Sequence, residues 1–201
     1  MTNSDSNATP AAFADIDNDG DMDLFGGERN SLIFFLENMG EALPEGPVFI
    51  QHYGSDTANP FYGVDMDNYP APTFADLDND GDLDGIIGDG EGDLVFFENF
   101  GDNAAPLFGK RVGDNSPFTG FDIGNNSRPV FVDIDGDGDM DMVSGGELNY
   151  SELGEAIIDE IGNRLNFFEN VGTKSAPVFE ERLGADNPLD SVITGRDDMA
   201  A

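Results

Sequence analysis

Apolar residues in this chain occur in short runs that glycine, asparagine and aspartate interrupt at close intervals. Four runs stand out, at 32–36, 72–75, 94–97 and 165–168. Short runs of this kind, with Gly and Asx punctuation about every 8–12 residues, are typical of antiparallel strands. The pattern therefore predicts an all-β protein built from many short strands.

The interruptions recur in a fixed order, which reveals an internal repeat of about 60 residues. An acidic nonapeptide appears three times, as DIDNDGDMD at 15–23, DLDNDGDLD at 76–84 and DIDGDGDMD at 133–141. Three more markers follow it in a constant order. The first is ENMG, ENFG or ENVG, at 37–40, 98–101 and 169–172. The second is PVF, PLF or PVF, at 47–49, 106–108 and 177–179, and the third is NPFYGVD, SPFTGFD or NPLDSVI, at 59–65, 116–122 and 187–193. We expect one repeat domain with units at 9–58, 59–115 and 116–186 and a closing segment at 187–201.

Each unit has room for four short strands, which is the size of one β-propeller blade. We therefore predict a β-propeller of four-stranded antiparallel blades, about three per chain. The third unit is 14 residues longer between its nonapeptide and its ENVG motif, and the extra residues fall within 148–163. This insertion is predicted to form a short helix and to contact a partner.

The nonapeptides have the spacing of a calcium loop. Each reads D-x-D-x-D-G-D-x-D, so that short carboxylates alternate along a tight turn that glycine permits. Ca²⁺ takes six to eight oxygen ligands, whereas uncompensated carboxylates at this spacing would repel one another. An EF-hand is excluded because loop position 12 is Gly26, Ile87 or Ser144 rather than glutamate. The Gly-Gly-x-Gly-x-Asp pattern of RTX repeats is also absent.

Composition narrows the function classes further. The chain has 42 acidic and 8 basic residues and a formal net charge of −34, so we expect neither nucleic acid nor anionic membrane surfaces as partners. No apolar run approaches the roughly 20 residues of a membrane-spanning helix. Cysteine is absent, which removes thiolate catalysis and cysteine–zinc sites. His52 is the only histidine, which argues against a histidine-built metal site and against a conventional Ser-His-Asp triad. We expect a non-enzymatic protein.

The units FADIDNDGDMDLFGGE, FADLDNDGDLDGIIGDGEG and FVDIDGDGDMDMVSGGE resemble FG-GAP/VCBS repeats, the blades of the integrin α-subunit β-propeller. The resemblance implies four antiparallel strands per blade, with Ca²⁺ in the hairpin between the first two and about three ions per chain. It implies side-chain ligands at loop positions 1, 3, 5 and 9: Asp15, Asp17, Asp19, Asp23, Asp76, Asp78, Asp80, Asp84, Asp133, Asp135, Asp137 and Asp141. Position 7 would contribute its main chain, at Asp21, Asp82 and Asp139.

Three blades make an implausibly tight ring, whereas this family closes rings of about six to eight. The closing segment at 187–199 carries the marker that precedes a nonapeptide, and the first unit lacks that marker. Two hypotheses follow: a homodimer that closes six blades by strand exchange at the termini, or a piece of a longer propeller.

Four functions remain open. The first is a calcium-stabilised module for adhesion or recognition, extracellular or at the cell surface because such loops need more calcium than the cytosol supplies. The second is a lectin-like carbohydrate binder, with Tyr53, Tyr62, Tyr69 and Tyr150 in place of the missing tryptophan. The third is an accessory domain of a secreted polysaccharide-active enzyme, and the fourth is a structural spacer.

Three recurring positions have structural interpretations. The pairs Phe34–Phe35, Phe96–Phe97 and Phe167–Phe168 are expected to form core between blades. The Glu of the ENxG motif, at 37, 98 and 169, is expected to have a turn or capping role, with a secondary calcium contact as the alternative. His52 is expected to be an ordinary residue of an outer strand.

Overall fold

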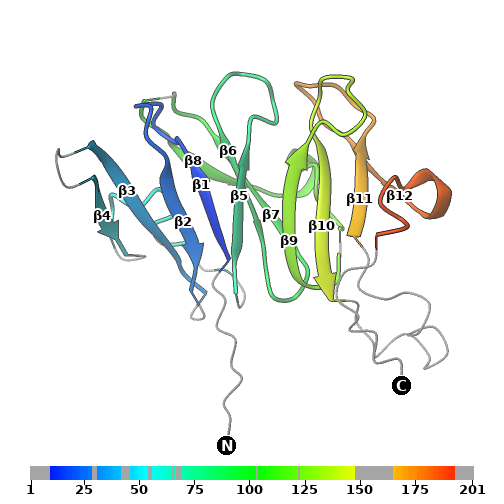
Figure 1. Ribbon diagram of the computed structural model, residues 1–201, viewed down its shortest axis with the longest axis horizontal. Helices are drawn as coiled ribbons and strands as arrows, with labels where there is room; N and C mark the ends of the chain where they lie inside the picture. The colour runs from blue at the N-terminus through cyan, green and yellow to red at the C-terminus, as the bar shows by residue number, and fades with distance from the viewer. Residues whose placement is uncertain are drawn as a thin grey trace, which may run out of the picture.

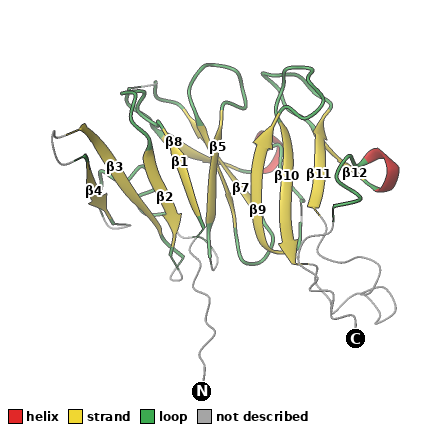
Figure 2. Ribbon diagram, viewed as in Figure 1, coloured by secondary structure: helices red, strands yellow, loops and turns green. Residues whose placement is uncertain are grey.

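The computed structural model describes residues 10–28, 31–41, 46–53, 56–64, 66, 69–102, 104–121, 123–147 and 165–192. These residues form three four-stranded antiparallel sheets with almost no helix (Figures 1 and 2). The predicted all-β class is therefore confirmed.

Each sheet is a simple meander in which strands adjacent in sequence are hydrogen-bonded neighbours. The first sheet contains β1 (Ala11–Ala14), β2 (Asp23–Gly27), β3 (Ile33–Glu41) and β4 (Pro47–His52). The second contains β5 (Ala71–Ala75), β6 (Asp84–Gly88), β7 (Leu94–Asn99) and β8 (Phe108–Arg111). The third contains β9 (Asn125–Val132), β10 (Asp141–Glu147), β11 (Leu165–Asn170) and β12 (Phe179–Arg182). Two short 3₁₀ turns, η1 (Gly113–Asn115) and η2 (Gly184–Asp186), follow the last strands of the second and third sheets.

The four predicted apolar runs lie in or overlap β3, β5, β7 and β11, and each predicted unit carries four strands. The helix predicted within 148–163 and the end of the closing segment lie outside the described residues. Among the described residues, no helix is long and apolar enough to cross a membrane.

The acidic nonapeptides occupy the hairpin between the first two strands of every sheet. Ala14 pairs with Asp23, Ala75 pairs with Asp84 and Val132 pairs with Asp141. Each nonapeptide therefore starts directly after the first strand and delivers its ninth residue to the start of the second. This is the predicted location.

The sheets stand side by side in a row, with β1 next to β5 and β5 next to β9 (Figure 1). One apolar cluster fills the space between the first and second sheets and includes Phe25, Phe35 and Phe97. A second cluster lies between the second and third sheets and includes Ile86, Phe96 and Phe168. The core of the molecule thus consists of two junctions between sheets.

The phenylalanine pairs serve both junctions because successive strand residues point to opposite faces of a sheet. On β7, Phe96 belongs to the junction with the third sheet, whereas Phe97 belongs to the junction with the first. Phe35 is buried in the junction between the first and second sheets, and Phe168 is buried in the junction between the second and third sheets. The predicted core role is confirmed for these four side chains.

Two glycines mark where backbones of neighbouring sheets come closest. A Cβ at Gly27 would collide with the carbonyl oxygen of Pro70, just before β5. A Cβ at Gly88 would collide with the carbonyl oxygen of Ser127 on β9. Glycine at the end of the second strand is therefore what lets adjacent sheets approach.

Candidate metal centres

The three acidic hairpins share the same backbone conformation at loop positions 4 and 6. Loop position 4 has a left-handed φ of 54° at Asn18, 60° at Asn79 and 82° at Gly136. Position 6 is glycine throughout, with φ between 94° and 98°. Asparagine and glycine are the residues that adopt this region at least cost, so the turn chemistry of the repeat dictates the loop shape.

Short aspartates hold each loop together by accepting hydrogen bonds from its own backbone. In the first loop, the Asp19 amide donates to Asp17 Oδ1 at 3.3 Å and the Asp21 amide donates to Asp19 Oδ1 at 2.9 Å. The Gly20 amide donates to Asp15 Oδ2 at 3.1 Å. The second loop repeats all three bonds. These Asx turns curl the chain around the carboxylates.

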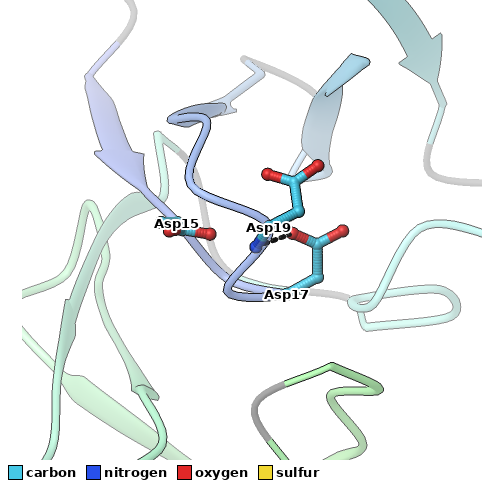
Figure 3. A group of neighbouring side chains, drawn as sticks. All are labelled: Asp15, Asp17 and Asp19. Carbon is cyan, nitrogen blue, oxygen red and sulfur yellow. Dashed lines mark hydrogen bonds between the residues drawn. The ribbon is translucent and has the colours of Figure 1, made fainter. Parts of the chain in front are cut away.

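In the first two hairpins the carboxylates of positions 1, 3 and 5 converge. One oxygen from each of Asp15, Asp17 and Asp19 lies within 4.8 Å of the other two, and Figure 3 shows the three side chains on the loop after β1. Asp76, Asp78 and Asp80 form the same group in the second loop. The predicted ligands of these positions are therefore brought together.

The third hairpin converges differently. There, oxygens of Asp133, Asp135 and Asp141 lie within 4.8 Å of one another, so position 9 takes the place of position 5. The Asp133 carboxylate accepts from the Gly136 amide at 2.7 Å rather than from the glycine at position 6. Glycine at position 4, where the other loops have asparagine, accompanies this change.

The remaining predicted ligands lie in the same hairpins but outside these groups of three. They are Asp21, Asp23, Asp82, Asp84, Asp137 and Asp139.

The aspartate of position 9 ties each loop to the third strand of its sheet. Asp84 is buried, and its Oδ1 accepts from the Asn99 amide at 2.9 Å while its Oδ2 accepts from the Leu77 amide at 3.1 Å. Asp141 has the equivalent bonds to the Asn170 and Ile134 amides. Asn99 is the asparagine of the ENxG motif, so this bond connects the motif to the nonapeptide that precedes it.

Several buried carboxylate oxygens in the described loops have no hydrogen-bond partner. They are Oδ1 of Asp15, Asp76, Asp82 and Asp139 and Oδ2 of Asp23. An unsatisfied buried carboxylate oxygen is energetically costly. Such oxygens occur in all three hairpins, where they could accept a further ligand.

The raised pKa values of several hairpin aspartates are also what a site for a cation would show. Burial, reinforced by Asp78 and Asp82, raises the pKa of Asp84 to about 7. Burial also raises the pKa of Asp23 to about 6, and burial together with Asp80 raises the pKa of Asp82 to about 6. The charged forms are disfavoured because the carboxylates are desolvated and close together. A bound cation would relieve both effects.

The donor set defines the class of cation. Carboxylate and carbonyl oxygens are hard ligands, which suit Ca²⁺ or Mg²⁺ rather than a thiolate- or imidazole-seeking metal. The three described groups could each hold one such ion.

The glutamate of the ENxG motif pairs with a cation on the fourth strand. Glu98 accepts from Arg111 Nε at 2.6 Å and from its Nη2 at 2.8 Å, and Glu169 accepts from Arg182 Nε at 2.7 Å. In the first sheet Glu37 contacts His52 Nε2 at 2.9 Å. The expected turn or capping role is therefore replaced by a pair across the last two strands.

His52 does lie on an outer strand, but its environment is not ordinary. It is buried, stacks on Phe35, and contacts Asp56 through Nδ1 at 2.9 Å. The common sequence signal was a basic or titratable residue 13 or 15 positions after the motif's glutamate.

A groove runs beside the acidic loop at each junction between sheets. The groove between the first and second sheets has a volume of about 480 Å³ and is lined by Asp17, Glu37 and Tyr62 among others. Its counterpart between the second and third sheets has a volume of about 560 Å³ and includes Asp78 and Glu98. Equivalent repeat positions therefore line both grooves.

No family model matches the chain, and neither a curated protein nor a solved structure is significantly similar to it.

Proposed function

We propose that the chain is a calcium-stabilised β-propeller module of the FG-GAP/VCBS type, non-enzymatic, that serves adhesion or recognition outside the cell or at its surface. In this proposal the three sheets are blades and each acidic hairpin holds one Ca²⁺. The observation that carries it is the set of three acidic hairpins with converging carboxylates and unpartnered buried oxygens.

Calcium is favoured over magnesium by the number and flexibility of the oxygens. Each nonapeptide contains five aspartates, whose side-chain and main-chain oxygens suit the six to eight oxygens that Ca²⁺ takes. Mg²⁺ requires a near-ideal octahedron and keeps several waters. Residues at positions 1, 3 and 5 would hold the ion in the first two loops, with positions 1, 3 and 9 in the third.

The ion would have a structural role. It would neutralise carboxylates whose charged forms the fold disfavours, and it would stabilise the hairpin that position 9 connects to the third strand. Binding to the folded state alone adds about 2.7 kcal/mol per site when free Ca²⁺ is 100-fold above Kd. Loops that lack the bidentate EF-hand glutamate need calcium above cytosolic levels, which supports the extracellular placement.

The test is calorimetric titration of the chelated protein with Ca²⁺ and with Mg²⁺, together with thermal unfolding. We expect three calcium ions per chain, a higher Tm in millimolar Ca²⁺ than in chelator, and a smaller effect of Mg²⁺. Asp15→Asn, Asp76→Asn and Asp133→Asn should each remove one ion. Glu91→Gln, an exposed acid outside the hairpins, is the matched control and should keep three. No change in Tm or heat on adding Ca²⁺ would refute the proposal.

The grooves at the junctions favour a carbohydrate as the recognised ligand. Each is lined by carboxylates, from Asp17 and Glu37 or from Asp78 and Glu98, and by aromatic rings. Carboxylates accept hydrogen bonds from sugar hydroxyls, and rings cover apolar sugar faces. Binding on a glycan array in calcium, weakened by Tyr62→Ala in the first groove, would support this. An array without binding would favour a protein ligand.

A further inference from the structure

The two covered junctions have the same construction, in which a single phenylalanine fills the space between sheets. Phe61, from the turn after β4, contacts Phe25 of the first sheet and stacks on Phe108 of the second with ring centroids 4.9 Å apart. Phe118, from the turn after η1, stacks on Phe179 of the third sheet at 5.2 Å. Both side chains are almost completely buried. A complete junction thus combines one inserted side chain, from the segment after one sheet, with two phenylalanine rings of the next sheet that pack around it. We call these two rings the receiving pair.

The outer face of the first sheet carries the receiving pair without its partner. Phe13 and Phe49 occupy the repeat positions of Phe74 and Phe108, which pack around Phe61. On the first sheet they are 64% and 40% exposed. This face is therefore built as the receiving half of a junction.

The outer face of the third sheet carries the opposite half. Leu189, in the NPLDSVI segment, occupies the repeat position of Phe61, and the Asn187 side chain anchors its turn to the Leu165 carbonyl. Val132 is 42% exposed, although its counterparts Ala14 and Ala75 are 4% and 6% exposed. Among the described residues, a Cβ at Gly145, the counterpart of Gly27 and Gly88, would meet only the Leu165 side chain.

We propose that these two faces bind one another between two copies of this chain. The occupant is a second copy because each face is one half of a junction that the molecule already makes twice. The two faces lie at opposite ends of the row of sheets, with the second sheet between them (Figure 1). Each contact joins the first sheet of one copy to the third sheet of the other, and two copies related by a two-fold axis make it twice and close a ring of six sheets.

The large negative charge of each chain makes this association depend on the salt concentration. Each chain has a formal net charge of −34, so two copies repel one another at low ionic strength. Salt screens that repulsion, while the contact itself is apolar through Phe13, Phe49 and Val132. We therefore expect the dimer to be favoured at higher salt, irrespective of which cation occupies the loops.

The first experiment is light scattering behind a sizing column on the full chain, in calcium and about 0.5 M NaCl, where the screening length is only a few ångströms. The expected mass is twice the 21.5 kDa of one chain. Phe13→Lys and Val132→Glu should each give monomer. Mixing these two variants should restore the dimer, because one junction then pairs the two introduced side chains, which have opposite charges, and the other junction is unaltered. Val112→Lys is the control, since Val112 is 63% exposed but lies in the connection between β8 and η1 rather than on the first or third sheet.

A second measurement uses the absence of cysteine from the chain. On oxidation, the double variant Phe13→Cys/Val132→Cys should form a covalent dimer, whereas Phe13→Cys/Val112→Cys should not. A monomer at high concentration and salt, or equal cross-linking of both double variants, would overturn the proposal. A monomer that still binds three calcium ions would overturn this inference while leaving the proposed function intact.

Discussion

His52 illustrates how one residue distinguishes a repeat that is otherwise regular. In the second and third sheets the glutamate of the ENxG motif pairs with an arginine on the neighbouring strand, whereas in the first sheet it pairs with His52, which also contacts Asp56. Burial lowers the pKa of His52, but hydrogen bonds to Asp56 and Glu37 together outweigh that effect and raise it. The first sheet therefore has a cross-strand pair that titrates.

This predicts a pH-dependent stability that the arginine variant lacks. Because the folded protein holds the His52 proton more tightly than the unfolded chain, the stabilisation is complete below the unfolded pKa of about 6.5. It is lost as pH rises through the higher folded pKa. Unfolding free energy measured from pH 5 to 9 should fall more steeply for the wild type than for His52→Arg.

The aspartates with raised pKa, such as Asp84, also titrate in this range. They are common to both proteins, so the difference between the two curves isolates His52. Parallel curves would contradict the prediction.

At the scale of the element, the end of the second strand decides how closely sheets approach. Gly88 and Gly145 occupy the same repeat position, on β6 and β10, but only Gly88 faces the backbone of a neighbouring sheet within the chain. Substitution by alanine adds the same methyl group at both positions. A neighbouring sheet covers this position at Gly88 but not, among the described residues, at Gly145.

Gly88→Ala should destabilise the chain by about 1–3 kcal/mol, because the added Cβ collides with the Ser127 carbonyl oxygen and forces the sheets apart. Gly145→Ala should change the stability of the monomer by less than about 0.5 kcal/mol. Urea unfolding at low protein concentration measures both. Gly145→Ala should also shift the light-scattering mass toward the monomer, and equal losses of stability in the two variants would argue against the junction geometry.

At the scale of the whole molecule, the main feature is the large negative net charge. Three divalent cations, each adding two charges, would bring the net charge from −34 to −28. The remaining charge would still be large, but ions in the hairpins would neutralise charge where carboxylates lie within 4.8 Å of one another. Such ions would therefore reduce local repulsion much more than the repulsion across the whole molecule.

This predicts how stability responds to salt. In chelator, Tm should rise steeply as NaCl increases from about 10 to 500 mM, because the screening length falls from roughly 30 Å to a few ångströms. In saturating Ca²⁺ the rise should be smaller, since the closest charges are already neutralised. Differential scanning fluorimetry of the wild type under both conditions measures the two slopes, and equal slopes would be inconsistent with cations in the hairpins.

The sequence by itself determined the local parts of this protein. The order of strands, the four strands per unit and the position of each acidic hairpin follow from apolar runs and from turn residues such as Gly20 and Asn79. Such features depend on neighbours within a few residues, where φ preferences and strand alternation act. The carboxylate oxygens that could bind a cation are likewise a property of the nonapeptide.

Only the tertiary structure decided which groups meet. It selected positions 1, 3 and 5 in two hairpins but 1, 3 and 9 in the third, and it paired Glu98 with Arg111. It also placed Phe61 inside a junction and left Phe13 exposed. These outcomes depend on contacts between distant segments, and identical repeat positions differ according to whether a neighbouring sheet covers them.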